Sequence, residues 1–463
     1  MIDNKDTIAA ISTPIGQAGI GIVRMSGDRA FDIAKRIFSP SSQTKISWNS
    51  SFKMFYGWVI DPDTGEKVDE VLLSLMKAPR TYTREDIVEI NCHGGIVPLR
   101  KVLEICIKQG ARLAEPGEFT RRAFLNGRID LSQAESVLDV VQAKTEKSLK
   151  LAVKSLGGEL SRRVSSIREK IVDLLSLMEA EIDFTEEDIQ VLDKEEKEKR
   201  VSSLIEKVGN LIEKANTGQI YREGVKVVIA GRTNVGKSSL LNTLLARERA
   251  IVSHIPGTTR DTIEEIVNIK GFPVCMIDTA GIGNFNTLLE KESVKRTCDS
   301  LKMADIVLLM VDGSSPLTEE DENAISLVKK LKKQTLLLIN KIDLPQKIDK
   351  GKLKNLFPDT SPVEISALEG TGLEKLKERI AKLILEKVTP DSEEIMVNLR
   401  QKDCLEKAKS CLLRAKEGLK KDVSVEFLAF ELREAISHLD EITGRRLGEE
   451  ILDRIFSQFC IGK

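Results

Sequence analysis

Short apolar runs alternate with helical patterns between residue 225 and about residue 385. Five runs have the length and β-branched content of buried strands. Apolar residues at helical spacing separate most of them, for example at 324–332 and 373–385. This alternation predicts a mostly parallel sheet with helices on both faces. The expected strands are 225–230, 274–277, 306–311, 335–339 and 363–365.

Residues 1 to about 125 show a different pattern of shorter alternating segments. Strands are expected at 7–12, 19–25, 54–60, 68–76 and 87–91, and a helix with one apolar face at 96–108. Glycine and proline residues between these segments favour an α+β domain with functional loops.

Long helical patterns flank the α/β segment on both sides. Apolar stripes at helical spacing run through 164–178 and 201–212, and the charge run at 191–200 predicts a solvated helix start. Helix returns from residue 398, where Leu399, Cys404, Ala408, Leu412 and Leu413 are expected to form one apolar set. The prediction is a multidomain fold, with an α/β domain inserted into an all-α domain made from two segments.

The composition excludes several classes of protein but does not indicate a function. A chain of 463 residues is too long for one core, so two to four domains are expected. The 71 Lys and Arg residues balance 72 Asp and Glu, so no overall basic charge indicates nucleic acid, although a local patch would still bind it. The chain has no apolar run long enough to predict a transmembrane helix, and its start does not have the pattern of a signal peptide. Its seven cysteines are scattered, so we expect neither a disulfide framework nor a zinc site, and a location in the reducing cytoplasm fits.

One loop carries the strongest chemical signal in the chain. Gly231-x-x-x-x-Gly236-Lys237-Ser238 lies between an expected strand and an expected helix, which is the context of a phosphate-binding loop. The two glycines let successive N–H groups turn toward phosphate oxygens, and the helix adds its positive end. We expect Lys237 to reach the β- and γ-phosphates and Ser238 to bind Mg²⁺.

Two further motifs fit the triphosphate and its metal. Asp278-Thr279-Ala280-Gly281 follows an apolar run, so its acid is placed to hold Mg²⁺ through water and Gly281 to sense the γ-phosphate. Residues 257–261 read GTTRD, and a threonine hydroxyl there would complete the Mg²⁺ shell, as in GTPase switches. Thr259 is preferred for this role over Thr258.

The base is predicted from Asn340-Lys341-Ile342-Asp343, which follows the apolar run TLLLI. The Asp343 carboxylate matches the ring N–H and amino group of guanine, a pattern that adenine lacks. Lys341 would lie along the base plane, and a backbone N–H of the Ser366–Leu368 loop would reach the guanine carbonyl. The GTP contacts expected from these motifs are Asn234, Val235, Gly236, Lys237, Ser238, Ser239, Gly257, Thr258, Thr259, Asp278, Thr279, Ala280, Gly281, Asn340, Lys341, Asp343, Ser366, Ala367 and Leu368.

The residue that positions the attacking water is not settled by spacing. Many GTPases use a glutamine just after the glycine of Asp-x-x-Gly, but this chain has Ile282 there, which cannot orient water. Glu290, Glu292 and a monovalent cation held by Asn234 are the alternatives.

Several of these segments together resemble the MnmE family, also called TrmE, of tRNA modification GTPases over the whole chain. The resemblance rests on GIVRMSG at 21–27, VEINCHGG at 88–95, EPGEFTRRAFLNGRIDLSQAE at 115–135, GRTNVGKSSLLN at 231–242, IPGTTRD at 255–261 and FCIGK at 459–463. It implies four segments: 1–122, a tetrahydrofolate-binding and dimerisation domain; 123–217, the first helical segment; 218–385, the GTPase domain; and 386–463, the second helical segment.

For the sites, the resemblance implies roles that spacing did not supply. A 5,10-methylene- or 5-formyl-tetrahydrofolate-type folate would contact Arg24, Glu89, Arg128 and Lys463, and Cys460 is either catalytic or a packed free thiol. Glu290 would position water. K⁺ would be bound by Asn234, Ser253, Ile255 and Thr258. The resemblance also adds Ser253, His254, Ile255 and Pro256 to the expected GTP contacts. Many family members carry an arginine shortly after DTAG, where this chain has Gly283-Asn284.

The resemblance also implies partners and a reaction. It predicts a K⁺-stimulated GTPase that works as a homodimer with an FAD-containing MnmG-type partner. Together they would add an aminomethyl or carboxymethylaminomethyl group at carbon 5 of the wobble uridine of certain tRNAs. Two alternatives are a ribosome-assembly GTPase switch that binds RNA without modifying it, and a folate enzyme with a regulatory GTPase domain. The first usually carries a basic and aromatic RNA-binding module, which we do not find in the sequence.

Overall fold

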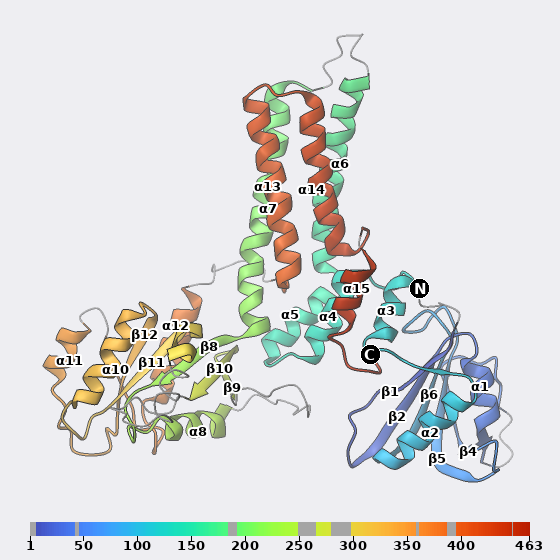
Figure 1. Cartoon of the computed structure of the whole chain (residues 1–463), viewed down its shortest axis with the longest axis horizontal. Helices are drawn as coiled ribbons and strands as arrows, with labels where there is room; N and C mark the ends of the chain where they lie inside the picture. The colour runs from blue at the N-terminus through green and yellow to red at the C-terminus, as the bar shows by residue number, and fades with distance from the viewer. Residues whose placement is uncertain are drawn as a thin grey trace. The chain divides into compact units, whose positions relative to one another are not determined.

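The computed structural model describes residues 6–41, 46–183, 192–248, 265–278, 298–357, 361–386, 395–446 and 448–463 (Figure 1). The chain divides into two compact units, which are described separately. The first unit comprises Met1–Leu138, Leu156–Arg168 and Ile436–Lys463, and the second comprises Asp139–Ser155 and Glu169–Ala435.

The first unit is built on a seven-stranded sheet in the order β3-β4-β5-β6-β2-β1-β7. Neighbouring strands are antiparallel except for β1 and β7, which are parallel. The strands are β1 (Ile8–Ile11), β2 (Ala18–Ser26), β3 (Phe38–Pro40), β4 (Lys53–Ile60), β5 (Lys67–Met76), β6 (Ile87–Gly94) and β7 (Arg112–Leu113).

The two faces of this sheet differ because successive side chains point to opposite sides. On one face Val59, Val71 and Leu73 pack into the core that α1 (Ala30–Ile37) and α2 (Ile96–Lys108) cover (Figure 1). On the opposite face, which we call the open face, Tyr56 and Leu72 are exposed cross-strand partners.

Further helices of the first unit come from distant parts of the sequence. They are α3 (Glu118–Leu125), most of α4 (Leu131–Val141), the start of α6 (Glu159–Asp183), the end of α14 (Val425–Thr443) and α15 (Glu449–Phe456). Phe456 and Phe459 pack against Leu131 in one apolar cluster. An isolated bridge between Pro116 and Ile461 then leads the C-terminal residues toward β1.

A buried charge cluster ties α3 to the rest of this unit. The Arg122 guanidinium is 2% exposed and forms ion pairs with Asp6, Glu85 and Glu118, the last at 2.9 Å. Burial alone would raise the pKa of Glu118, but hydrogen bonds from Arg112, a backbone amide and Arg122 outweigh it and hold the pKa below its usual value. Asp6 and Glu118 both have a lowered pKa, so they are ionised and paired with Arg122 at neutral pH.

The second unit contains a six-stranded sheet in the order β13-β12-β11-β8-β10-β9. All neighbouring pairs are parallel except β9 and β10. The strands are β8 (Val225–Ala230), β9 (Glu265–Ile269), β10 (Phe272–Asp278), β11 (Ile306–Asp312), β12 (Gln334–Asn340) and β13 (Val363–Glu364). The central strand β11 is buried along its whole length, as a parallel strand covered on both faces should be.

Helices cover both faces of this second sheet. The helices α8 (Lys237–Glu248) and α12 (Leu373–Leu385) contribute Leu240 and Leu376 to one core. On the other face, α10 (Glu319–Lys330) and α11 (Lys350–Leu356) contribute Ile325 and Leu353 to a second core. The arrangement is a three-layer α/β domain.

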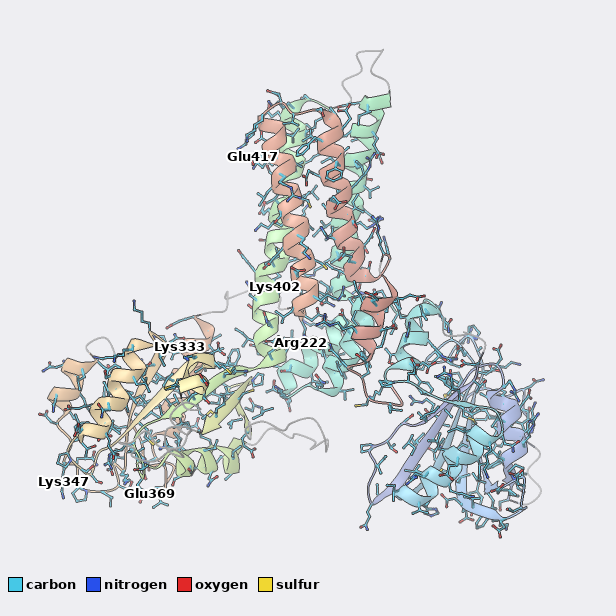
Figure 2. All side chains as sticks on the ribbon, in the orientation of Figure 1. Arg222, Lys333, Lys347, Glu369, Lys402 and Glu417 are labelled. Carbon is cyan, nitrogen blue, oxygen red and sulfur yellow. The ribbon has the colours of Figure 1, made fainter. Side chains whose placement is uncertain are left out.

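Long helices complete the second unit. The helix α7 (Lys194–Glu223) begins at the Asp193 N-cap and packs along α13 (Leu399–Lys420), which begins at the Asn398 capping box (Figure 1). Lys402 and Glu417 mark the two ends of α13 in Figure 2. The helix α5 (Glu146–Leu156) packs Leu151 and Ala152 into the core beneath β8.

The multidomain fold expected from the sequence is confirmed, and so are the helix at 96–108 and the five parallel-type strands within one or two residues. The strand β9 and the helix α1 were not expected from the sequence. Each is so short that its alternation of apolar and polar residues does not show a clear strand or helix period. The apolar set on α13 was wrong at two positions, since Leu399 is 58% and Leu413 is 47% exposed. Among the helices that the structure describes, none combines the length and apolar character needed to cross a membrane.

Candidate functional sites

The loop between β8 and α8 has the backbone of a phosphate-binding loop. Gly231, Asn234 and Gly236 have φ values of 151°, 59° and 101°, which glycine and asparagine adopt most readily. A Cβ atom on Gly236 would lie 2.4 Å from Asn340 Nδ2, so the close approach of the two loops also requires a glycine. The residues therefore form a tight cradle of backbone amides.

Lys237 lies inside this loop, at the first position of α8. Its Nζ atom donates to the carbonyl oxygens of Gly231 at 3.2 Å and Arg232 at 2.9 Å. Ser238 and Ser239 follow on the exposed first turn of the helix. An ammonium group, a hydroxyl and a helix N-terminus converging on one loop are the donor set that a Mg²⁺-bound triphosphate needs.

Asn340 joins three loops of the site. Its side-chain amide is 2% exposed and donates through Nδ2 to the Val235 carbonyl at 2.7 Å. Its Oδ1 accepts from the Ala367 amide at 2.9 Å. One side chain thus fixes the Asn340–Asp343 motif to the phosphate loop and to the loop after β13.

Lys341 is held by a carboxylate that the sequence motifs did not include. Its Nζ lies 2.7 Å from Asp312 Oδ2, at the end of β11. Asp312 is 7% exposed, and burial would raise its pKa, but hydrogen bonds from Lys341 and Ser314 outweigh burial and lower it. The guanidinium of Arg232, in the phosphate loop, lies 3.7 Å from the same carboxylate.

The expected base-contact residues lie at the carboxyl edge of the sheet. Asp343 is exposed and the Leu368 side chain is 82% exposed, whereas Ser366 is fully buried. Figure 2 shows Lys347 and Glu369, which follow β12 and β13, at the edge opposite Lys333. Ligands of open α/β sheets bind at this carboxyl edge.

Part of the expected site lies outside the described residues. This holds for Ser253, His254, Ile255, Pro256, Gly257, Thr258, Thr259, Thr279, Ala280, Gly281, Ile282, Gly283, Asn284, Glu290 and Glu292, and for the side chain of Asp278. Their roles toward water, Mg²⁺ and K⁺ stay predictions. Among the described residues, no group of three or more His, Cys, Asp or Glu side chains could hold a metal ion.

The first unit contains a separate cavity of about 490 Å³. Its size is within the usual range for small-molecule sites. All four residues that the resemblance assigned to folate line it, although they are distant in sequence. The lining residues are Ser12, Arg24, Met76, Tyr82, Ile87, Glu89, Arg128, Ile129, Gln133, Val137, Leu156, Gly462 and Lys463.

Arg24 and Glu89 form a cross-strand pair on the open face. They are register partners on β2 and β6, and Arg24 Nε and Nη2 contact Glu89 Oε1 at 2.8 and 2.7 Å. Arg24 Nη1 also donates to the Gly462 carbonyl at 3.4 Å. Because both contacts that the described residues make to the Glu89 side chain use Oε1, its Oε2 atom is left to accept from a ligand.

Two buried polar atoms in the cavity wall have no hydrogen-bond partner among the described residues. They are Ser12 Oγ and Arg128 Nε. The Arg128 guanidinium lies over the Tyr82 ring, 4.5 Å from its centroid. A buried polar atom without a partner costs free energy, so the wall is suited to a ligand that supplies hydrogen bonds.

The C-terminal residues reach this cavity in a specific backbone conformation. Gly462 has φ of 95°, and a Cβ atom there would lie 2.4 Å from the Ile11 carbonyl oxygen. Lys463 is thereby brought to the cavity wall. Cys460 is exposed and is not among the residues that line the cavity, and its role stays a prediction.

Four contributors to the two sites were missed from the sequence. Asp312 had a usable signal, because it ends an apolar run, as Asp278 does. Arg232 was an unassigned position of the loop motif. Ser12 and Tyr82 had no signal, because their relevance depends on a cavity wall assembled from distant segments.

Comparisons with known proteins agree along the whole chain. A sequence model described as the MnmE helical domain matches residues 131–460, and one described as the GTP-binding protein TrmE N-terminus matches residues 7–128. The chain is 49% identical over 467 residues to a tRNA modification GTPase MnmE of Carboxydothermus hydrogenoformans, covering 99% of this chain and 100% of the relative. It is 48% identical over 460 residues to the protein of the same name from Desulforamulus reducens, covering 99% of each. A solved structure of an Aquifex aeolicus Era variant bound to GDP and AlF4⁻ is 29% identical and covers 41% of this chain and 66% of that chain. Its TM-score is 0.29, which is too low to support an argument about fold.

Proposed function

The chain belongs to the MnmE family of tRNA modification GTPases, and from that premise we propose a two-site enzyme. It is a GTP hydrolase that acts in tRNA modification. We propose that GTP binds at the carboxyl edge of the second unit's sheet and that a folate one-carbon carrier binds in the cavity of the first unit. The cavity lined by Arg24, Glu89 and Arg128 carries the second part of the proposal.

The chemistry of the cavity suits a reduced folate. A pterin ring presents a donor edge that matches the Oε2 atom of Glu89, and Arg24 fixes that carboxylate in place. Arg128 and Lys463 offer cations to the glutamate tail of the carrier. The apolar side of the cavity, which includes Met76, would pack against the ring faces.

Binding of 5-formyltetrahydrofolate, measured by isothermal titration calorimetry, tests this site directly. The wild-type chain should bind, and Arg128→Met should weaken binding at least tenfold because the tail loses a cation. Arg100→Met is a matched control, since it removes the same charge from the outer face of α2, away from the cavity lining. No binding by the wild type, or equal binding by both variants, would reject the folate site.

The reaction in this proposal joins the two sites through partners. With an MnmG-type FAD protein, the chain would add an aminomethyl or carboxymethylaminomethyl group at carbon 5 of the wobble uridine of certain tRNAs in the cytoplasm. Nucleoside analysis of tRNA from a strain lacking the chain should show that modification missing. Unchanged modification, with no redundant pathway, would favour the alternative of an RNA-binding switch.

Hydrolysis is proposed to use K⁺ and Glu290. The left-handed backbone of Asn234, with φ of 59°, turns this exposed residue out from the loop, which supports a role as cation ligand. GTP turnover should be faster in K⁺ than in Na⁺ at equal ionic strength, and Glu290→Ala should keep GTP binding while turnover is lost. Equal rates in the two salts would remove the cation from the mechanism.

A homodimer through the first unit is also part of the proposal. The open face carries the exposed apolar side chains Ile20, Met54, Tyr56 and Leu72, at 60%, 60%, 51% and 39% exposure. Exposed apolar groups gathered on one sheet face are typical of protein interfaces. Leu72→Glu should convert the dimer to a monomer in light-scattering measurements, and a wild-type monomer would contradict the assignment.

The segment boundaries at 122, 217 and 385 remain part of the proposal.

A further inference from the structure

The clearest unassigned feature of the GTPase domain is the carboxylate at the end of β11. Asp312 sits on the strand between β8, which leads into the phosphate loop, and β12, which leads into the Asn340–Asp343 motif. It is the register partner of Asn340 on β12. The position therefore adjoins both nucleotide-binding loops at the edge where ligands bind.

Asp312 receives a cation from each of these two loops. Lys341 Nζ lies 2.7 Å from Oδ2, and Arg232 Nη2 lies 3.7 Å from the same oxygen. Ser314 donates its amide at 2.9 Å and its hydroxyl at 2.6 Å to Oδ1. Both carboxylate oxygens are therefore engaged, and the group is fixed in one orientation.

Arg232 is itself anchored on its far side. Its Nε donates to Asp321 at 3.1 Å, and its Nη2 donates to the Ser315 hydroxyl at 2.9 Å. Asp321 is 3% exposed and closes the capping box of α10. The chain Asp321–Arg232–Asp312–Lys341 thus links rigid secondary structure to a lysine beside the predicted base site.

We propose that Asp312 is a positioning residue for guanine-nucleotide binding, which holds the Lys341 ammonium in place and ties the phosphate loop to the base-recognition loop. The inference rests on the proposed contact of Lys341 with the base plane. A flexible lysine loses side-chain entropy when a ligand fixes it, whereas a lysine already fixed by a buried carboxylate has lost that entropy during folding. Pre-organisation of Lys341 would therefore appear as tighter nucleotide binding.

The first test measures GDP affinity with a fluorescent GDP analogue in the full chain. Asp312→Asn keeps the shape but removes the charge, and the dissociation constant should rise at least tenfold. Glu322→Gln is the matched control, because it removes the same charge and a Lys352 ion pair of the same 2.7 Å length, but from an exposed site. The control should bind GDP as the wild type does.

A double-mutant comparison separates positioning from a merely structural role. If Asp312 acts through Lys341, then Asp312→Asn combined with Lys341→Met should bind GDP no more weakly than Lys341→Met alone. Additive losses would show that Asp312 acts independently of Lys341 and would overturn the inference. Wild-type affinity of Lys341→Met would instead reject the proposed role of Lys341 and leave GTP binding itself untouched.

A milder variant keeps the test decisive if Asp312→Asn does not fold. Ser314→Ala removes only the hydroxyl that orients Asp312 and leaves the buried charge paired. It should weaken GDP binding about threefold, in the same direction as Asp312→Asn. Wild-type GDP affinity of Ser314→Ala in a chain where Asp312→Asn cannot be folded would count against positioning.

Discussion

Replacing Asn340 by alanine should loosen the nucleotide site at one identifiable amide. In the wild type, the Ala367 N–H donates to Asn340 Oδ1 at 2.9 Å, and Ala367 is 2% exposed. Removing the acceptor leaves a buried donor without a partner, at a cost of about 1–3 kcal/mol. Since about 1.4 kcal/mol is tenfold in an equilibrium constant, the Ala367 amide should exchange its hydrogen about 5- to 150-fold faster.

The two ends of the Asn340 amide can be separated by a second substitution. Asn340→Asp keeps an acceptor for Ala367 but loses the donor that bonds the Val235 carbonyl at 2.7 Å. This variant should protect the Ala367 amide as the wild type does, while GDP affinity falls because the phosphate loop has lost its anchor. Asn340→Ala should lose both properties.

Hydrogen exchange followed by mass spectrometry, on peptides covering residues 361–372, provides the assay, together with GDP titration of the same samples. Equal exchange at Ala367 in Asn340→Ala and Asn340→Asp would show that the side-chain acceptor does not protect this amide. Wild-type GDP affinity in both variants would show that joining the loops is not needed for binding. Either result would refute the reasoning from the buried amide.

Three further predictions concern stability and steric fit. Arg122→Met should destabilise the first unit by about 3–5 kcal/mol, because it leaves buried carboxylates such as Glu118 with one cation fewer; urea unfolding followed by tryptophan fluorescence reports on this unit alone, since the chain's two tryptophans both lie in it. Glu118 has a lowered pKa in the folded state, so on acidification the unfolded chain takes up the proton first. The stability that ionised Glu118 contributes should be complete above the unfolded pKa and be lost as pH falls through the folded pKa. A free energy of unfolding that stays constant over that acid range would contradict the pairing. Gly236→Ala should abolish measurable GDP binding, because its Cβ would lie 2.4 Å from Asn340 Nδ2, whereas Gly448→Ala, with open space around its Cβ position, should bind GDP normally.

The linear pattern was sufficient for the GTPase domain because its signals are local. A strand, a glycine loop and a helix lie within eighteen residues at 225–242, and the motifs that begin at Asp278 and Asn340 each follow a buried apolar run. In a parallel sheet the carboxyl ends of the strands meet at one edge, so motifs after successive strands must converge. The positions of Asn340, Lys341 and the phosphate loop at that edge agree with this reasoning.

In the first unit, the local sequence pattern predicted most strands but not the site. Periodicity predicted most of its strands, but the apolar pattern could not show which face α1 and α2 would leave open. The resemblance alone grouped residues 24, 89, 128 and 463. The cavity that these residues share depends on cross-strand register and on the bridge between Pro116 and Ile461. Those are long-range contacts, which no sequence window contains.

The sequence by itself therefore determined the nucleotide-binding motifs, the sheet-and-helix order and the family, because each depends on residues close together in the chain. Only the tertiary structure decided which side chains hold those motifs in place. Asp312 pairs with Lys341 and Arg232 because β11 lies between β8 and β12, an order that the sequence does not state. Arg122 is buried among carboxylates, and Ser12 faces a cavity, for the same reason: packing brings together groups that chain distance keeps apart.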